Sequence, residues 1–97
     1  MTAPSTPFAN ETRAFVILLQ KQLPFTEAVI ECHVAYLHDL NNHNALVIAG
    51  PFCDGTGGMV VIRAGNPDEA MRIAHRDPFV SEGFETCTVR EIELVTG

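Results

Sequence analysis

The chain has 97 residues, which is enough for one domain with one modest hydrophobic core. Its formal net charge is −6 and its six lysines and arginines are scattered, so we expect no DNA or RNA partner, because polyanion binding needs clustered basic residues. An ordinary hydrophobic fraction excludes general disorder, yet no apolar run approaches the roughly 20 residues that span a bilayer. These properties indicate one globular domain without a membrane segment.

The N-terminus has neither the basic start nor the long apolar stretch of a secretory signal. We expect a flexible tail at residues 1–12, which are rich in Pro, Thr and Ala, and a folded domain over 13–97. The three cysteines form no Cys-x-x-Cys pair and predict reduced thiols in a cytoplasmic protein; they are Cys32, Cys53 and Cys87. A nucleophile pair of Cys32 with His33 is poorly aimed, because adjacent helical positions point about 100° apart.

The first element is a strand over Arg13 to Gln20 that is apolar on both faces. Alternate side chains point to opposite sides, and the two sets are Phe15, Ile17 and Leu19 against Ala14, Val16 and Leu18. Two helices cover one face of a small sheet and leave the other face bare. A second copy of the protein is the economical cover, so the strand predicts a homodimer through the sheet faces.

After Pro24, a helical pattern runs over about Phe25 to Asn42, with an apolar stripe on one side. The stripe contains Val29, His33, Tyr36, Leu37 and Leu40. Asn44 is suited to the left-handed backbone that ends a helix. The apolar run from Ala45 to Ala49 then predicts a buried strand.

Gly50-Pro51-Phe52 breaks that strand, and the glycine-rich turn at 54–58 leads to a return strand over Met59 to Arg63. The turn is not a phosphate loop, because it lacks a Gly-Lys-Ser/Thr ending and precedes a strand. Asn66-Pro67-Asp68-Glu69 supplies a cap, a first-turn proline and a capping-box glutamate, and so predicts a helix start. Pro78 ends this helix.

The last element, about Phe84 to Val95, alternates in polarity and predicts a strand with one wetter face. The predicted order is β-α-β-β-α-β. Two right-handed crossovers over one antiparallel sheet give an α+β fold of the ferredoxin-like type, with two helices on one face of four strands.

His33 and Asp77 are ionisable residues set among apolar neighbours, where burial without a partner is expensive. A proton-transfer pair would explain both, since imidazole titrates near neutral pH and a carboxylate can orient it. The alternative for His33 is a core histidine bonded to a backbone carbonyl. The alternative for Asp77 is a turn residue that bonds the backbone after Pro78.

Tyr36 lies three residues after His33 on the same helix side, so its hydroxyl either donates to a substrate oxygen or packs at the rim of the core. Gly50 and Pro51 end a strand, and they either allow close approach of a ligand or only make a tight exit. The other histidines share no metal-ligand spacing with each other or with the cysteines, so we expect no metal; they are His38, His43 and His75.

Several motifs, taken in order, resemble the YCII-related domain family over about Arg13 to Ile92. They are the His-x-x-Tyr-Leu helix, the Ala49-Gly50-Pro51 strand end, the glycine-rich hairpin, and Asp77-Pro78-Phe79 with Gly83. The resemblance implies a dimeric α+β barrel in which two four-stranded sheets pack face to face.

The resemblance also implies that His33 and Asp77 are candidate active-site residues, and that Phe79 joins Tyr36, Gly50 and Pro51 as a candidate substrate-binding residue. A relative in this family acts as a dehydrochlorinase on a chlorinated hydroxyquinol. Many members carry arginine three residues before the histidine, where this chain has Ile30. That change removes a carboxylate or phosphate clamp, so an anionic substrate is not expected at this position.

These observations predict a small enzyme without a cofactor that moves a proton on a small organic substrate, as a lyase, a dehydrochlorinase or an isomerase does. His33 would be the base or acid and Asp77 its partner. Two alternatives stay open: a non-catalytic dimeric module for ligand binding or an accessory role, and a cofactor-free monooxygenase.

Overall fold

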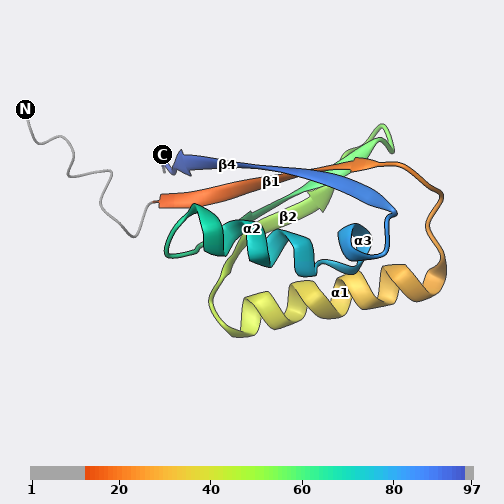
Figure 1. The fold of residues 1–97 in the computed structure, drawn as a ribbon, viewed down its shortest axis with the longest axis horizontal. Coiled ribbons are helices and arrows are strands. Elements are labelled where there is room, and N and C mark those ends of the chain that lie inside the picture. The colour runs from red at the N-terminus through yellow and green to blue at the C-terminus, as the bar shows by residue number, and fades with distance from the viewer. Residues whose placement is uncertain (1–12, 96–97) are drawn as a thin grey trace, which may run out of the picture.

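The computed structural model describes residues 13–95, and the tail expected at 1–12 lies outside this range. The strands form one antiparallel sheet in the order β2-β3-β1-β4, with the helices on one face (Figure 1). In chain order the elements are β1 (Arg13–Lys21), α1 (Glu27–Asn42), β2 (Leu46–Pro51), β3 (Gly57–Ile62), α2 (Pro67–Arg76), α3 (Pro78–Ser81) and β4 (Glu85–Glu93). This confirms the predicted ferredoxin-like α+β fold. The short helix α3 is an addition that the sequence pattern did not indicate.

Strand β1 lies inside the sheet because it pairs with both β3 and β4. Its residues Phe15, Ile17 and Leu19 face the helices and are at most 5% exposed. They form the core together with residues from α1, β3 and α2, namely Leu40, Val60, Ile62, Ala70, Ile73 and Ala74. The predicted alternation along this strand therefore selects the face on which the helices pack.

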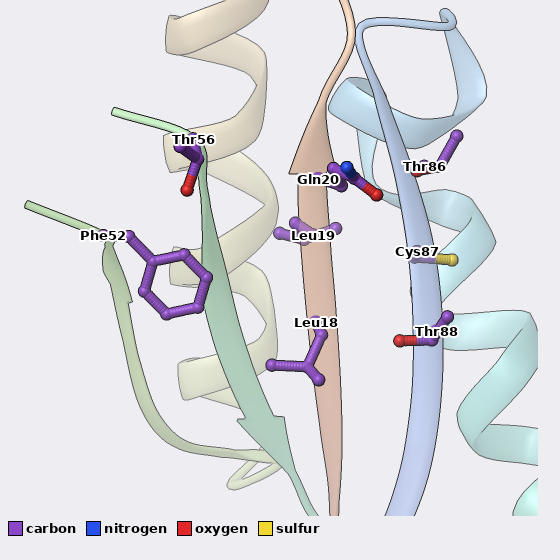
Figure 2. Close-up of a pocket in the computed structure, with 8 residues that line it drawn as sticks. All are labelled: Leu18, Leu19, Gln20, Phe52, Thr56, Thr86, Cys87 and Thr88. Atoms are coloured by element: carbon purple, nitrogen blue, oxygen red, sulfur yellow. The ribbon is translucent and has the colours of Figure 1, made fainter. Parts of the chain in front are cut away.

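The opposite face of the sheet is free of helices (Figure 1). Leu18 is 37% exposed on this face. Ile48 and Ile92 point to the same side, because the pairing of the strands aligns them with the β1 residues that share the orientation of Leu18. A hollow of about 460 Å³ lies there, with Leu18, Phe52 and Thr88 in its wall, and α1 passes behind the sheet in this view (Figure 2). The exposed apolar face is the surface for which the sequence predicts a second copy.

The prediction of a buried strand after Asn44 is wrong in its burial. Strand β2 lies at the edge of the sheet and pairs only with β3, and its residue Ile48 is 57% exposed. An apolar run of this length is equally compatible with an edge strand, because sequence periodicity does not report how many neighbours a strand has.

The ends of α1 are set by local side-chain chemistry. The helix begins at Glu27, two residues later than predicted, because the Thr26 hydroxyl accepts a hydrogen bond from the Val29 N–H at 3.1 Å. Beyond the helix, Asn44 has a φ of 59°, which confirms the predicted left-handed residue.

Helix α2 begins as predicted, with the Asn66 side chain accepting from the Glu69 N–H at 2.8 Å and proline in the first turn. The Glu69 carboxylate reaches back to the N–H of Gly65 and not to that of Asn66, so the capping box is displaced by one residue.

Gly57 and Gly50 lie on neighbouring strands and offer a matched test of backbone constraint. Gly57 has a φ of 154°, and a Cβ there would collide with the carbonyl oxygen of Leu19, whereas a Cβ at Gly50 would meet nothing within 4 Å. We expect Gly57→Ala to lower the free energy of unfolding by more than about 3 kcal/mol and Gly50→Ala to change it by less than about 0.5 kcal/mol. Urea unfolding measures both, and equal losses would contradict this account.

Candidate functional site

His33 and Asp77 come from distant parts of the chain and meet on the helical side of the sheet. The His33 Nδ1 lies 2.9 Å from the Asp77 Oδ1, with the side chains 14% and 2% exposed. His33 projects from the middle of α1, and Asp77 occupies the junction of α2 and α3. Pro78 holds Asp77 in extended backbone, with φ −62° and ψ 125°, which aims the carboxylate away from either helix axis.

The same Asp77 oxygen caps α3, because Oδ1 also accepts a hydrogen bond from the Phe79 N–H at 2.9 Å. The turn role and the partner role that sequence treats as alternatives are therefore both present. With the Asp77 oxygen as acceptor, the Nδ1–H of His33 is oriented toward Asp77, and the ring lone pair is on Nε2.

The phenylalanine rings of Phe79 and Phe25 form a stack with the imidazole of His33. The Phe79 ring lies between Phe25 and His33, with centroid distances of 4.2 Å and 4.1 Å and interplanar angles of 14° and 18°. Phe84 meets Phe25 edge-on at 6.3 Å, and the Lys21 Nζ lies 4.5 Å from the centroid of the Phe25 ring. Phe79, a candidate substrate-binding residue, is 7% exposed and packed on both faces, so it holds the imidazole plane in place and offers no free ring face to a substrate.

Tyr36 is close to His33, at a ring-centroid distance of 6.2 Å, but its hydroxyl points to α2. The hydroxyl donates a hydrogen bond to the Ile73 carbonyl at 2.7 Å. Burial raises the pKa of Tyr36, and the charge of Asp77 adds to the rise, so the phenol keeps its proton. Since a hydroxyl has one proton, Tyr36 joins α1 to α2 and donates to a substrate oxygen only by giving up Ile73.

Gly50 and Pro51 lie on the edge strand β2, at the far side of the sheet from β4. Both are exposed, and the sheet order separates them from the Asp77 region by β3 and β1. The structure therefore does not bring these two candidate residues to the His33–Asp77 pair. A role for them in ligand approach stays a prediction.

Glu85 is a site residue that sequence reasoning missed. It is 4% exposed at the start of β4, opposite Lys21, and it shares the inward phase of Cys87. Burial raises the pKa of Glu85, and so does the charge of Asp77, while His33 and Lys21 oppose the rise. The sequence does carry a signal for its burial: Glu85 and Cys87 are two residues apart on a strand, so their side chains point to the same face.

Cys87 itself is half-buried, and burial followed by the charge of Asp77 raises the pKa of its thiol. Within residues 13–95, no group of three or more His, Cys, Asp or Glu side chains is arranged to hold a metal ion. In the same range, none of the helices has the length and apolar character needed to cross a membrane.

The model of the YCII-related domain matches residues 14–93, which is nearly all of the described part of the chain. The chain belongs to the YCII-related domain family. A relative in this family, the uncharacterized protein YjpA of Bacillus subtilis (strain 168), is 34% identical over 80 residues, which are 82% of this chain and 94% of YjpA. The resemblance inferred from the motifs is thereby confirmed.

A solved structure with a similar fold is 5-chloro-2-hydroxyhydroquinone dehydrochlorinase (TftG) from Burkholderia phenoliruptrix AC1100, in complex with 2,5-dihydroxybenzoquinone. Its TM-score is 0.64 at 22% sequence identity, and the match covers 87% of this chain and 95% of TftG. At this identity the similarity shows a shared fold.

Glu85 makes the stability of the protein depend on pH in a predictable direction. Because its pKa is raised above the ordinary 4.5 on folding, its contribution to stability is complete below that value and is lost as pH rises through the raised pKa. Glutamine stays neutral, so we expect Glu85→Gln to gain stability relative to the parent as pH increases from 4 toward 8.

Thermal unfolding of both proteins across this range measures the difference. Glu31→Gln, which removes an exposed carboxyl from α1, is the control and should run parallel to the parent. A constant offset between Glu85→Gln and the parent at all pH values would contradict the expectation.

Proposed function

We propose that this protein is a small enzyme that transfers a proton on a small organic substrate, in the manner of a lyase or an isomerase. The observation that carries the proposal is the hydrogen bond between His33 Nδ1 and Asp77 Oδ1, at 2.9 Å, with Asp77 almost fully buried. A buried carboxylate that orients an imidazole is the arrangement that general base catalysis uses.

In this mechanism the His33 Nε2 removes a proton from the substrate, and Asp77 stabilises the imidazolium that forms. The electron pair of the broken bond to hydrogen forms a double bond, and in an elimination a leaving group such as chloride departs with its own bonding pair. The imidazolium then returns its proton to solvent or, in an isomerisation, to another atom of the same substrate. The contact with Asp77 uses Nδ1, so Nε2 is the ring nitrogen assigned to this step.

One comparison supports an aromatic or unsaturated cyclic substrate. The fold is shared with TftG, whose name and ligand are those of a dehydrochlorinase bound to a dihydroxybenzoquinone. A dehydrochlorinase-type elimination is the finer form of the proposal.

We further propose that the protein is a homodimer that buries the open faces of its two sheets. Leu18, Ile48 and Ile92 are 37% to 57% exposed on that face, and large apolar side chains exposed on one face favour an interface. His33 and Asp77 both come from one chain on the other face, so each subunit holds a complete pair.

The second candidate function is a non-catalytic dimeric module that binds a ligand. The observation that favours it is that both polar groups already have structural partners. Asp77 accepts the hydrogen bond from the Phe79 N–H that caps α3, and the Tyr36 hydroxyl donates its proton to the Ile73 carbonyl. In this reading the His33–Asp77 bond ties α1 to the α2–α3 junction and does no chemistry.

Replacement of His33 separates these two functions. We expect His33→Ala to lower kcat by about 10² to 10⁴, the usual contribution of a general base, while the variant stays folded. Chloride release from 5-chloro-2-hydroxyhydroquinone is the first assay, followed by proton exchange on related hydroxylated rings. His43→Ala is the control, because His43 is an exposed histidine of the same region.

Binding of 2,5-dihydroxybenzoquinone without turnover of any of these compounds would favour the non-catalytic module. Unchanged turnover in His33→Ala would remove His33 as the catalytic base and overturn the proposed mechanism.

The dimer is tested by a charge on the open face. We expect Leu18→Asp to convert a dimer into monomers, because a buried unpaired carboxylate opposes association. Val34→Asp is the matched control, since Val34 is 44% exposed on α1, away from the open face, and should stay dimeric. Analytical ultracentrifugation at micromolar concentration reads both variants, and a monomeric parent protein would contradict the proposal.

A further inference from the structure

Asp77 and Glu85 are the two buried acidic residues within residues 13–95, and only one of them is well hydrogen-bonded. Asp77 Oδ1 accepts from His33 and from the Phe79 N–H. Glu85 is 4% exposed, and its Oε1 accepts no hydrogen bond from any described residue. A buried carboxylate without donors is disfavoured in its ionised form, so the two acids face opposite demands.

Residues from several neighbouring elements surround Glu85. From β1, Lys21 stands opposite Glu85 in the sheet, but its ammonium lies over the Phe25 ring at 4.5 Å from the centroid. From α1 comes His33, and from the α2–α3 junction comes Asp77, both of which act on Glu85 through their charge. Helix α3, Pro78–Ser81, carries no charged residue, and the next inward residue of β4 is Cys87.

We propose that Glu85 is a positioning residue of the His33–Asp77 pair: a buried acid whose undonated Oε1 favours the protonated form and so concentrates the negative charge beside the imidazole on Asp77. The inference rests on the function proposed for that pair. Two buried carboxyl groups that act on each other through their charge do not both ionise readily, and the proton goes to the one whose oxygens have fewer donors.

The protonated form of Glu85 suits the proposed chemistry. When His33 takes a proton from an uncharged substrate, the substrate becomes an anion, and a second carboxylate nearby would repel it. The site therefore suits an uncharged substrate with an acidic proton, such as a phenol or an enolisable carbonyl compound. When Glu85 ionises, its proton passes to solvent and no other bond changes.

The carboxyl carbon of Glu85 reports this state directly. In protein labelled with ¹³C-glutamate, we expect the titration midpoint of Glu85 to lie above the ordinary glutamate value of 4.5, with Glu85→Gln giving the assignment. Asp77→Asn should lower the midpoint, because it removes a negative charge that acts on Glu85, and His33→Ala should raise it.

His43→Ala is the control and should leave the Glu85 midpoint in place. If Asp77→Asn does not fold, Lys21→Met supplies a second reading, since loss of that ammonium should raise the midpoint.

A Glu85 that titrates at the ordinary value of 4.5, or one whose midpoint neither Asp77→Asn nor His33→Ala moves, would overturn the inference even where His33→Ala abolishes turnover. A Glu85 coupled as described, in a protein whose turnover survives His33→Ala, would leave the shared charge standing and overturn only the proposed catalysis.

Discussion

The carboxylate of Asp77 connects more of this structure than any other described group. One oxygen accepts hydrogen bonds from the His33 ring and from the Phe79 backbone, and it does so at the point where α2 ends and α3 begins. The charge is buried, and buried charge is tolerated only with donors close by. The position of α1 against the α2–α3 junction, the plane of the imidazole and the stacking of Phe79 on it all follow from this contact.

Burial, reinforced by the charge of Asp77, raises the pKa of Tyr36, of Glu85 and of the Cys87 thiol. Each of these shifts favours the neutral form of the group. This disfavours Cys87 as a thiolate nucleophile and is consistent with the proposal that the imidazole of His33 moves the proton.

The two faces of the sheet carry different features. The helical face holds the His33–Asp77 pair and the aromatic stack, whereas the open face carries exposed Leu18 and the hollow beside Phe52 (Figure 2). The proposed association through the open face and the proposed proton transfer on the other face therefore involve different residues. Changes on one face are expected to leave the other largely intact, since the central sheet lies between them.

The fold class, the phase of β1, the caps at Thr26 and Asn66 and the left-handed Asn44 follow from local patterns, because periodicity and capping act within a few residues. The family motifs singled out His33 and Asp77, but the 2.9 Å contact between them joins residues 44 positions apart. The edge position of β2, the partner of the Tyr36 hydroxyl and the burial of Glu85 likewise depend on which elements become neighbours in space. Burial and strand order are properties of the packed layers, and no local window of sequence contains them.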